Sequence, residues 1–192
     1  ISKTVAGCFA SLRQIRSIRR SVPRPVLQSF MAALVVSKLD YGNATLAGLP
    51  AVQLNRLQTV LNAAARLIFT ARKYEHITPL LRELHWLRIP ERITFKLATL
   101  VYRSQQGTVP QYLSEQLHRV ADIESRRPLR SSSTAALVVP VTRCSTIGDR
   151  AFSVAASRAW NSLPPTVQSG GTLDLFRRRL KTELFQRSFS AD

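Results

Sequence analysis

The feature that most constrains this sequence is a run of apolar residues at helical spacing between positions 51 and 71. Intervals of three and four place these residues on one face of an α-helix. The stripe consists of Leu54, Leu57, Leu61, Ala64 and Ile68. A chain with such a stripe must bury it against other elements, and the small residues at its centre allow a second helix to approach closely. The run therefore predicts a helical bundle.

Further segments share this period or carry helix-boundary residues. We expect helices over about 4–20, 26–39, 77–87, 90–104, 110–117 and 152–163, and a last helix after Thr172. Segment 26–39 is apolar all round, which is typical of a buried helix. Thr172 can cap the last helix, and Gly170-Gly171 can act as a hinge before it. One short strand or hairpin is expected at 137–141, where Pro140 favours an edge position. The expected fold class is mainly α.

Charge narrows the class of partner. The 192 residues contain 28 Lys and Arg against 11 Asp and Glu, a net charge of +17. The excess is spread evenly, with +6 over residues 1–48, +5 over 49–118 and +6 over 119–192. A cationic folded body predicts a polyanionic partner, above all RNA or DNA. The longest apolar run, 31–36, is far too short to span a membrane, so we expect no membrane partner.

Basic residues recur at helical spacing in several places, and 23 of the 28 are arginine, which binds phosphate bidentately. A basic stripe on a helix is often only a solvated surface. With so few acidic residues to neutralise the stripes, we expect nucleic-acid contact instead. The candidate residues are Arg13, Arg16 and Arg20; Arg92, Lys96 and Arg103; Arg126, Arg127 and Arg130; and Arg177, Arg178 and Lys181.

The sequence gives little support to catalysis. Metal-dependent phosphoryl transfer needs clustered carboxylates, and the acidic residues here are scattered, with Asp122 and Glu124 the closest pair. Cys8, Cys144 and the histidines show no metal-binding spacing. No glycine-rich phosphate loop or nucleophile elbow is visible. We therefore expect no catalytic residue, no metal site and no cofactor in this chain.

Six strings in order carry a resemblance to a known family: LDYGNATLAGLP (39–50), LQTVLNAAARLI (57–68), HITPLLRELHWL (76–87), RITFKLATLVYR (92–103), GDRAFSVAASRAWNSLP (148–164) and FRRRLKTELF (176–185). Together they resemble the region that follows the polymerase core in reverse transcriptases of non-LTR retrotransposons, the LINE elements of the chicken-repeat and jockey type. The resemblance covers nearly the whole chain, and the ordered set is far more specific than any single string.

The resemblance implies a non-catalytic fragment of an RNA-directed DNA polymerase. In that family the catalytic aspartates of an (F/Y)-A-D-D motif lie in an upstream palm, which would also hold Mg²⁺, and this chain has no such motif. The implied task is to hold the template–primer duplex, an RNA–DNA hybrid, together with element RNA or target DNA during target-primed reverse transcription. The implied location is intracellular, nuclear with a cytoplasmic ribonucleoprotein stage. Because the chain starts with Ile1, we expect it to be a piece of a longer protein.

By the resemblance, residues 1–71 form a thumb-like helical bundle and 72–120 a helical extension. Residues 121–148 form a basic linker rich in Ser and Arg, and 149–192 smaller C-terminal helices. Two other interpretations stay open. One is a stand-alone basic α-helical module that binds RNA or protein and derives from such an element. The other is an enzyme whose site the sequence does not reveal.

Overall fold

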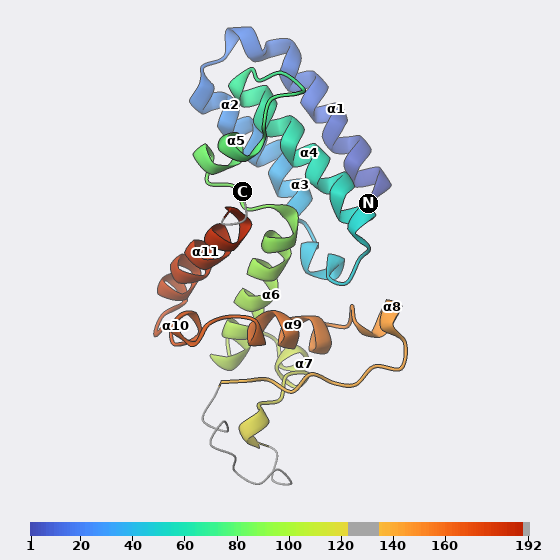
Figure 1. Cartoon of the computed structure of the whole chain (residues 1–192), viewed down its shortest axis with the longest axis vertical. Helices are drawn as coiled ribbons and strands as arrows, with labels where there is room; N and C mark the ends of the chain where they lie inside the picture. Colours follow the sequence, from blue (N-terminus) through green and yellow to red (C-terminus); the bar gives the residue numbers. More distant parts are fainter. Residues whose placement is uncertain (123–134, 190–192) are drawn as a thin grey trace. The chain divides into compact units, whose positions relative to one another are not determined.

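The computed structural model of the chain describes residues 1–122 and 135–189, and these are mainly α-helical (Figure 1). This confirms the expected fold class. The helices are α1 (Ser2–Ile18), α2 (Arg24–Met31), α3 (Ser37–Asp40), α4 (Ala51–Phe69), α5 (Thr78–Glu83), α6 (Ile89–Gln105), α7 (Gln111–Ser114), α8 (Ser145–Gly148), α9 (Phe152–Asn161), α10 (Pro165–Gln168) and α11 (Leu173–Phe189). A π-helical turn, Ala32–Val36, joins α2 to α3, and a 3-10 turn, Arg19–Ser21, follows α1.

The chain forms two compact units whose boundaries differ from the segments expected by resemblance. One unit contains residues 1–43 and 50–92 with the end of α11, and the other contains 44–49 and 93–187. The expected boundary at 71/72 falls inside the first unit. The physical reason is that the segment after α4 is bonded back to it: the Ile89 amide donates to Gln58 Oε1 at 2.9 Å, and the Arg66 guanidinium donates to the Glu75 carbonyl at 3.1 Å.

The core of the first unit forms around the apolar stripe of α4. Leu57, Leu61, Ala64 and Ile68 are buried, and Leu54 at the solvent end is half-buried. Helices α1, α2 and α5 each pack against α4. The stripe that predicted a bundle is thus the surface around which the first unit assembles.

The continuous helix formed by α2, the π turn and α3 buries residues at strict four-residue intervals. These residues are Leu27, Met31, Val35 and Leu39. In an ideal α-helix, a row spaced by four residues drifts about 40° per step, because one turn takes 3.6 residues. The wider π turn at Ala32–Val36 takes up this drift, so the row stays on one face. The expectation that segment 26–39 is buried all round is wrong, since Val26 and Leu34 on its other face are 42% and 45% exposed.

The core of the second unit is aromatic. Trp160 of α9 is fully buried and stacks on Phe176 of α11, with ring centroids 5.8 Å apart. Tyr102 of α6 stacks on the other side of this cluster, 4.5 Å from the Phe176 centroid. Trp160 Nε1 donates to the Ala135 carbonyl at 2.8 Å, which satisfies its one donor. Helices α6, α9 and α11 are thereby joined through three rings.

The segment expected as a strand forms only one isolated antiparallel bridge, between Leu137 and Arg119, and the described residues contain no longer strand. The other edge of Leu137 is taken by a side chain. Asn161 Nδ2 donates to the Leu137 carbonyl at 2.8 Å, and Asn161 Oδ1 accepts its amide at 2.9 Å. An amide side chain replaces the second strand that would extend the ladder.

The glycine pair before α11 has a packing role in place of the expected hinge. Gly170 is buried, and its carbonyl accepts the Tyr102 hydroxyl at 2.8 Å. A Cβ on Gly170 would lie 3.0 Å from the Phe176 Cα, whereas a Cβ on Gly171 would meet nothing within 4 Å. The expected cap after the pair is confirmed, since Thr172 Oγ1 accepts the Leu175 amide at 3.3 Å.

We predict that Gly170→Ala destabilises the second unit by about 1–3 kcal/mol, because the added methyl group overpacks the backbone of α11. Gly171→Ala is the matched control and should change the unfolding free energy by less than about 0.5 kcal/mol. Urea unfolding followed by tryptophan fluorescence measures both. Equal effects of the two substitutions would contradict the close packing at Gly170.

Candidate nucleic-acid interface

Helix α1 separates an apolar side from a basic side. Its buried positions are Cys8, Ser11, Leu12 and Ile15. Arg13 and Arg16 are exposed, and Arg20 is exposed in the 3-10 turn directly after the helix. We call Arg13, Arg16 and Arg20 the α1 basic face. Their spacing of three and four residues puts them along one side of the helix, as the sequence predicted.

The α1 basic face has no carboxylate to neutralise it. Asp40 is the only acidic residue before Glu75 in the sequence, and it is already bound to Arg92. Within the described residues, none of the three arginines makes an ion pair or a side-chain hydrogen bond. Their guanidinium groups are therefore available to an external anion.

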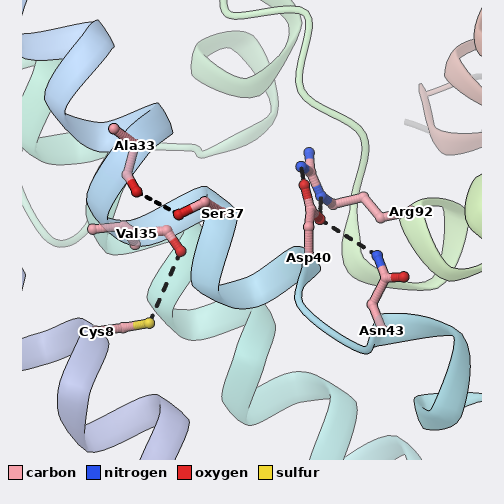
Figure 2. Close-up of polar contacts among 7 residues, drawn as sticks. All are labelled: Cys8, Ala33, Val35, Ser37, Asp40, Asn43 and Arg92. Atoms are coloured by element: carbon pink, nitrogen blue, oxygen red, sulfur yellow. Dashed lines mark hydrogen bonds and ion pairs between the residues drawn. The ribbon is translucent and has the colours of Figure 1, made fainter.

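Helix α1 is held to its neighbours by contacts that use no acidic group. Ser11 Oγ accepts a hydrogen bond from Lys38 Nζ at 3.0 Å, and Cys8 Sγ lies 4.0 Å from the Val35 carbonyl oxygen (Figure 2). Burial raises the pKa of the Cys8 thiol, and the nearby Lys38 ammonium opposes this shift only in part. Cys8 is thus a neutral packing group.

Arg92 is the one candidate residue that forms an ion pair within the described part of the chain. Its Nε donates to Asp40 Oδ1 at 2.8 Å, and its Nη2 bonds Asp40 Oδ2 (Figure 2). Asn43 Nδ2 also donates to Asp40 Oδ1, at 3.4 Å. The Arg92 side chain is only 16% exposed. This bidentate pair fastens the end of α3 to the start of α6, so we assign Arg92 a structural role.

The other α6 candidates belong to the second unit. Lys96 is exposed, whereas Arg103 is half-buried and its Nη2 donates to the Thr108 carbonyl at 2.9 Å. Arg103 thereby closes the turn after α6. The row Arg92, Lys96 and Arg103 looks uniform in sequence, but only Lys96 is free of contacts within the described residues.

Helix α11 carries the last candidate cluster. Arg177, Arg178 and Lys181 are all exposed. Arg178 lines a groove between α10 and α11 together with Arg179, while Arg177 and Lys181 do not line it. The candidates Arg126, Arg127 and Arg130 lie outside the described residues.

Sequence reasoning missed two arginines that the structure places in defined contacts. Arg24 pairs with Glu83, and its guanidinium lies 4.1 Å from the centroid of the Phe69 ring. Arg179 donates from Nη1 to the Thr166 carbonyl at 3.0 Å. Arg24 had no periodic signal. Arg179 stands inside the FRRRL string, where the sequence cannot distinguish it from Arg177 and Arg178.

In the second unit, Asp149 binds two neighbours. Its Oδ1 accepts the Arg158 guanidinium and the Thr142 hydroxyl, each at 3.0 Å. The hydrogen bond from Arg158, followed by that from Thr142, lowers the pKa of this carboxyl below its ordinary value. Asp149 therefore stays ionised at neutral pH and ties the segment before α8 to α9.

Two searches of the described residues gave no further site. No group of three or more His, Cys, Asp or Glu side chains in residues 1–122 and 135–189 is placed to hold a metal ion. None of the helices described is both long enough and apolar enough to cross a membrane.

We predict that Asp40→Ala lowers the unfolding free energy of the first unit by about 1–2 kcal/mol, because it leaves the half-buried Arg92 charge unpaired. Glu83→Ala is the matched control. It removes an ion pair whose side chains are 47% and 56% exposed, and should cost less than about 0.5 kcal/mol. Urea unfolding followed by circular dichroism measures both. A larger effect at Glu83 than at Asp40 would contradict the structural role of Arg92.

We predict that the contribution of Asp149 to stability is present at neutral pH and is lost in acid. The folded pKa lies below the unfolded value of 3.8, so stability falls as the pH drops through the folded pKa. The difference in urea midpoint between the native chain and Asp149→Asn should therefore shrink as the pH falls below about 4. A difference that stays constant from pH 7 to pH 2 would contradict the ion pair.

Comparisons of the whole chain with protein-family models, with curated proteins and with solved structures give no match.

Proposed function

We propose that this chain is a non-catalytic nucleic-acid-binding part of a retrotransposon RNA-directed DNA polymerase of the LINE type. Its task is to hold the template–primer duplex and to contact element RNA or target DNA. The observation that carries the binding proposal is the α1 basic face, Arg13, Arg16 and Arg20, which is exposed and has no carboxylate partner among the described residues. The ordered sequence strings support the retrotransposon origin.

The chemistry of the α1 basic face suits a partner read by its backbone. Guanidinium groups bind phosphate oxygens bidentately, and a row of them on a helix can follow successive phosphates. Such contacts carry no base specificity, so a duplex can slide while it stays bound. A polymerase that copies any sequence needs this kind of grip. An RNA–DNA hybrid presents A-like geometry, which proteins recognise by shape and by 2′-hydroxyl groups.

The same proposal assigns the chemistry of polymerisation elsewhere. The chain is no enzyme by itself, and the aspartates with their Mg²⁺ belong to an upstream palm that would be its protein partner. The proposed setting is intracellular, nuclear with a cytoplasmic ribonucleoprotein stage. The proposed ligands are RNA, DNA and the RNA–DNA hybrid.

One observation favours a second candidate, a stand-alone module that binds another protein. On the helix formed by α2, the π turn and α3, Val26 and Leu34 are more than 40% exposed, and Tyr41 directly after it is 91% exposed. Apolar side chains in such a position are typical of a surface that another chain covers. Binding assays separate the two candidates, because only the first requires affinity for nucleic acid that depends on the α1 basic face.

We predict that Arg13→Gln/Arg16→Gln/Arg20→Gln weakens binding of an RNA–DNA hybrid. The slope of log affinity against log salt concentration should fall by about 2–3, because three phosphate contacts are lost. Fluorescence anisotropy with a labelled hybrid between 50 and 200 mM salt measures the slope.

The control variant is Lys3→Gln/Arg56→Gln/Lys73→Gln, which removes the same charge at exposed positions of the same unit. It should leave the slope nearly unchanged. If both variants lower the slope equally, binding follows net charge and the α1 basic face has no special role. If neither variant binds differently from the native chain, the proposed function fails and the protein-interaction candidate takes its place.

A further inference from the structure

A groove of about 670 Å³ lies between α10 and α11, in the second unit. One wall is formed by α10 and the residue after it, with Thr166 and Ser169. The other wall is formed by α11, with Arg178, Arg179 and Thr182. Val167 lies at its base and is 5% exposed. The groove is therefore apolar only at the bottom and is lined by cations and hydroxyl groups toward the solvent.

The two guanidinium groups in the groove are in different states. Arg179 is held in place, because its Nη1 donates to the Thr166 carbonyl at 3.0 Å. The remaining N–H donors of its planar group stay available. Arg178 is exposed and makes no hydrogen bond or ion pair with the described residues. One fixed and one adaptable guanidinium group on the same wall form a donor set for a phosphate group.

The single acidic residue among those lining the groove is already neutralised. Glu183 Oε1 accepts Arg187 Nε at 2.7 Å, and Arg187 Nη2 also donates to the Ser162 carbonyl at 2.7 Å. Arg187 itself does not line the groove. Glu183 thus adds little repulsion toward an anion, and the net charge presented to a ligand is positive.

We infer that this groove binds backbone phosphates of a single nucleic-acid strand, at a site separate from the α1 basic face. Its volume decides between strand types. Cavities of about 300–1,000 Å³ hold a ligand of drug size, which corresponds to one or two nucleotides and not to a duplex. The groove has no aromatic side chain among its lining residues, so recognition rests on phosphate and ribose, without base stacking. This inference rests on the proposed function and names a second ligand state for it.

The test is binding of a fluorescein-labelled oligouridylate of twelve residues, which has no stable secondary structure, to the full chain. Arg178→Gln/Arg179→Gln should reduce the salt slope by about 1.4, as expected for two lost single-strand contacts. Glu183→Gln should strengthen binding, because it removes the only carboxylate of the groove. Arg119→Gln/Arg143→Gln removes the same charge at exposed sites outside the groove and should leave the slope nearly unchanged.

The outcomes separate the inference from the proposed function. An unchanged oligouridylate slope in Arg178→Gln/Arg179→Gln, with the hybrid slope still dependent on the α1 basic face, overturns the inference alone. Loss of neither dependence overturns both. Displacement of the oligouridylate by inorganic tripolyphosphate at equal phosphate concentration would show a site for free polyphosphate and would also overturn the inference. If the double variant unfolds, Arg178→Gln alone decides, because Arg178 makes no contact that the fold needs.

Discussion

A shortage of carboxylates governs how this chain can fold and what it can bind. With 28 basic and 11 acidic residues, the protein cannot neutralise its own surface. The ion pairs that the structure describes join separate segments: Asp40 fastens α3 to α6, and Asp149 fastens the segment before α8 to α9. Each such pair takes a carboxylate away from the basic helix faces. The cations left over repel one another, and a bound polyanion is the simplest way to relieve that repulsion.

The sequence was sufficient where structure is determined locally. The period of three and four residues identified the main helices, and Thr172 marked the start of α11, because these signals act within one or two turns. It was insufficient where contacts are distant along the chain. Asp40 lies 52 residues from Arg92, so nothing near Arg92 indicated that its charge is occupied. The bridge at Leu137 likewise depends on the Asn161 side chain, 24 residues away, which periodicity cannot reveal.

The same distinction applies within the candidate sites. A pattern of arginines states how many cations a helix carries, and only the fold decides which are free. On α1 the three predicted residues remain exposed, whereas on α6 the row contains an ion-paired, a free and a turn-closing residue in succession. On α11 the neighbouring Arg178 and Arg179 differ, since one is unbound and the other is fixed by a carbonyl. Preorganised donors lose less entropy when they bind, so the held arginines determine geometry and the free ones supply adaptable charge.

The π turn sets a rule for how this protein can change during evolution. The buried row Leu27, Met31, Val35 and Leu39 stays in phase only because the Ala32–Val36 turn is wider than an α-helical one. Deleting one residue there would restore an α-helix and rotate everything after it by about 100°. Leu39 would leave the core, and Asp40 would turn away from Arg92. Substitutions along this helix are therefore tolerable wherever size and polarity fit, but its length is fixed, and an insertion or deletion would separate the two ends of the first unit's main ion pair.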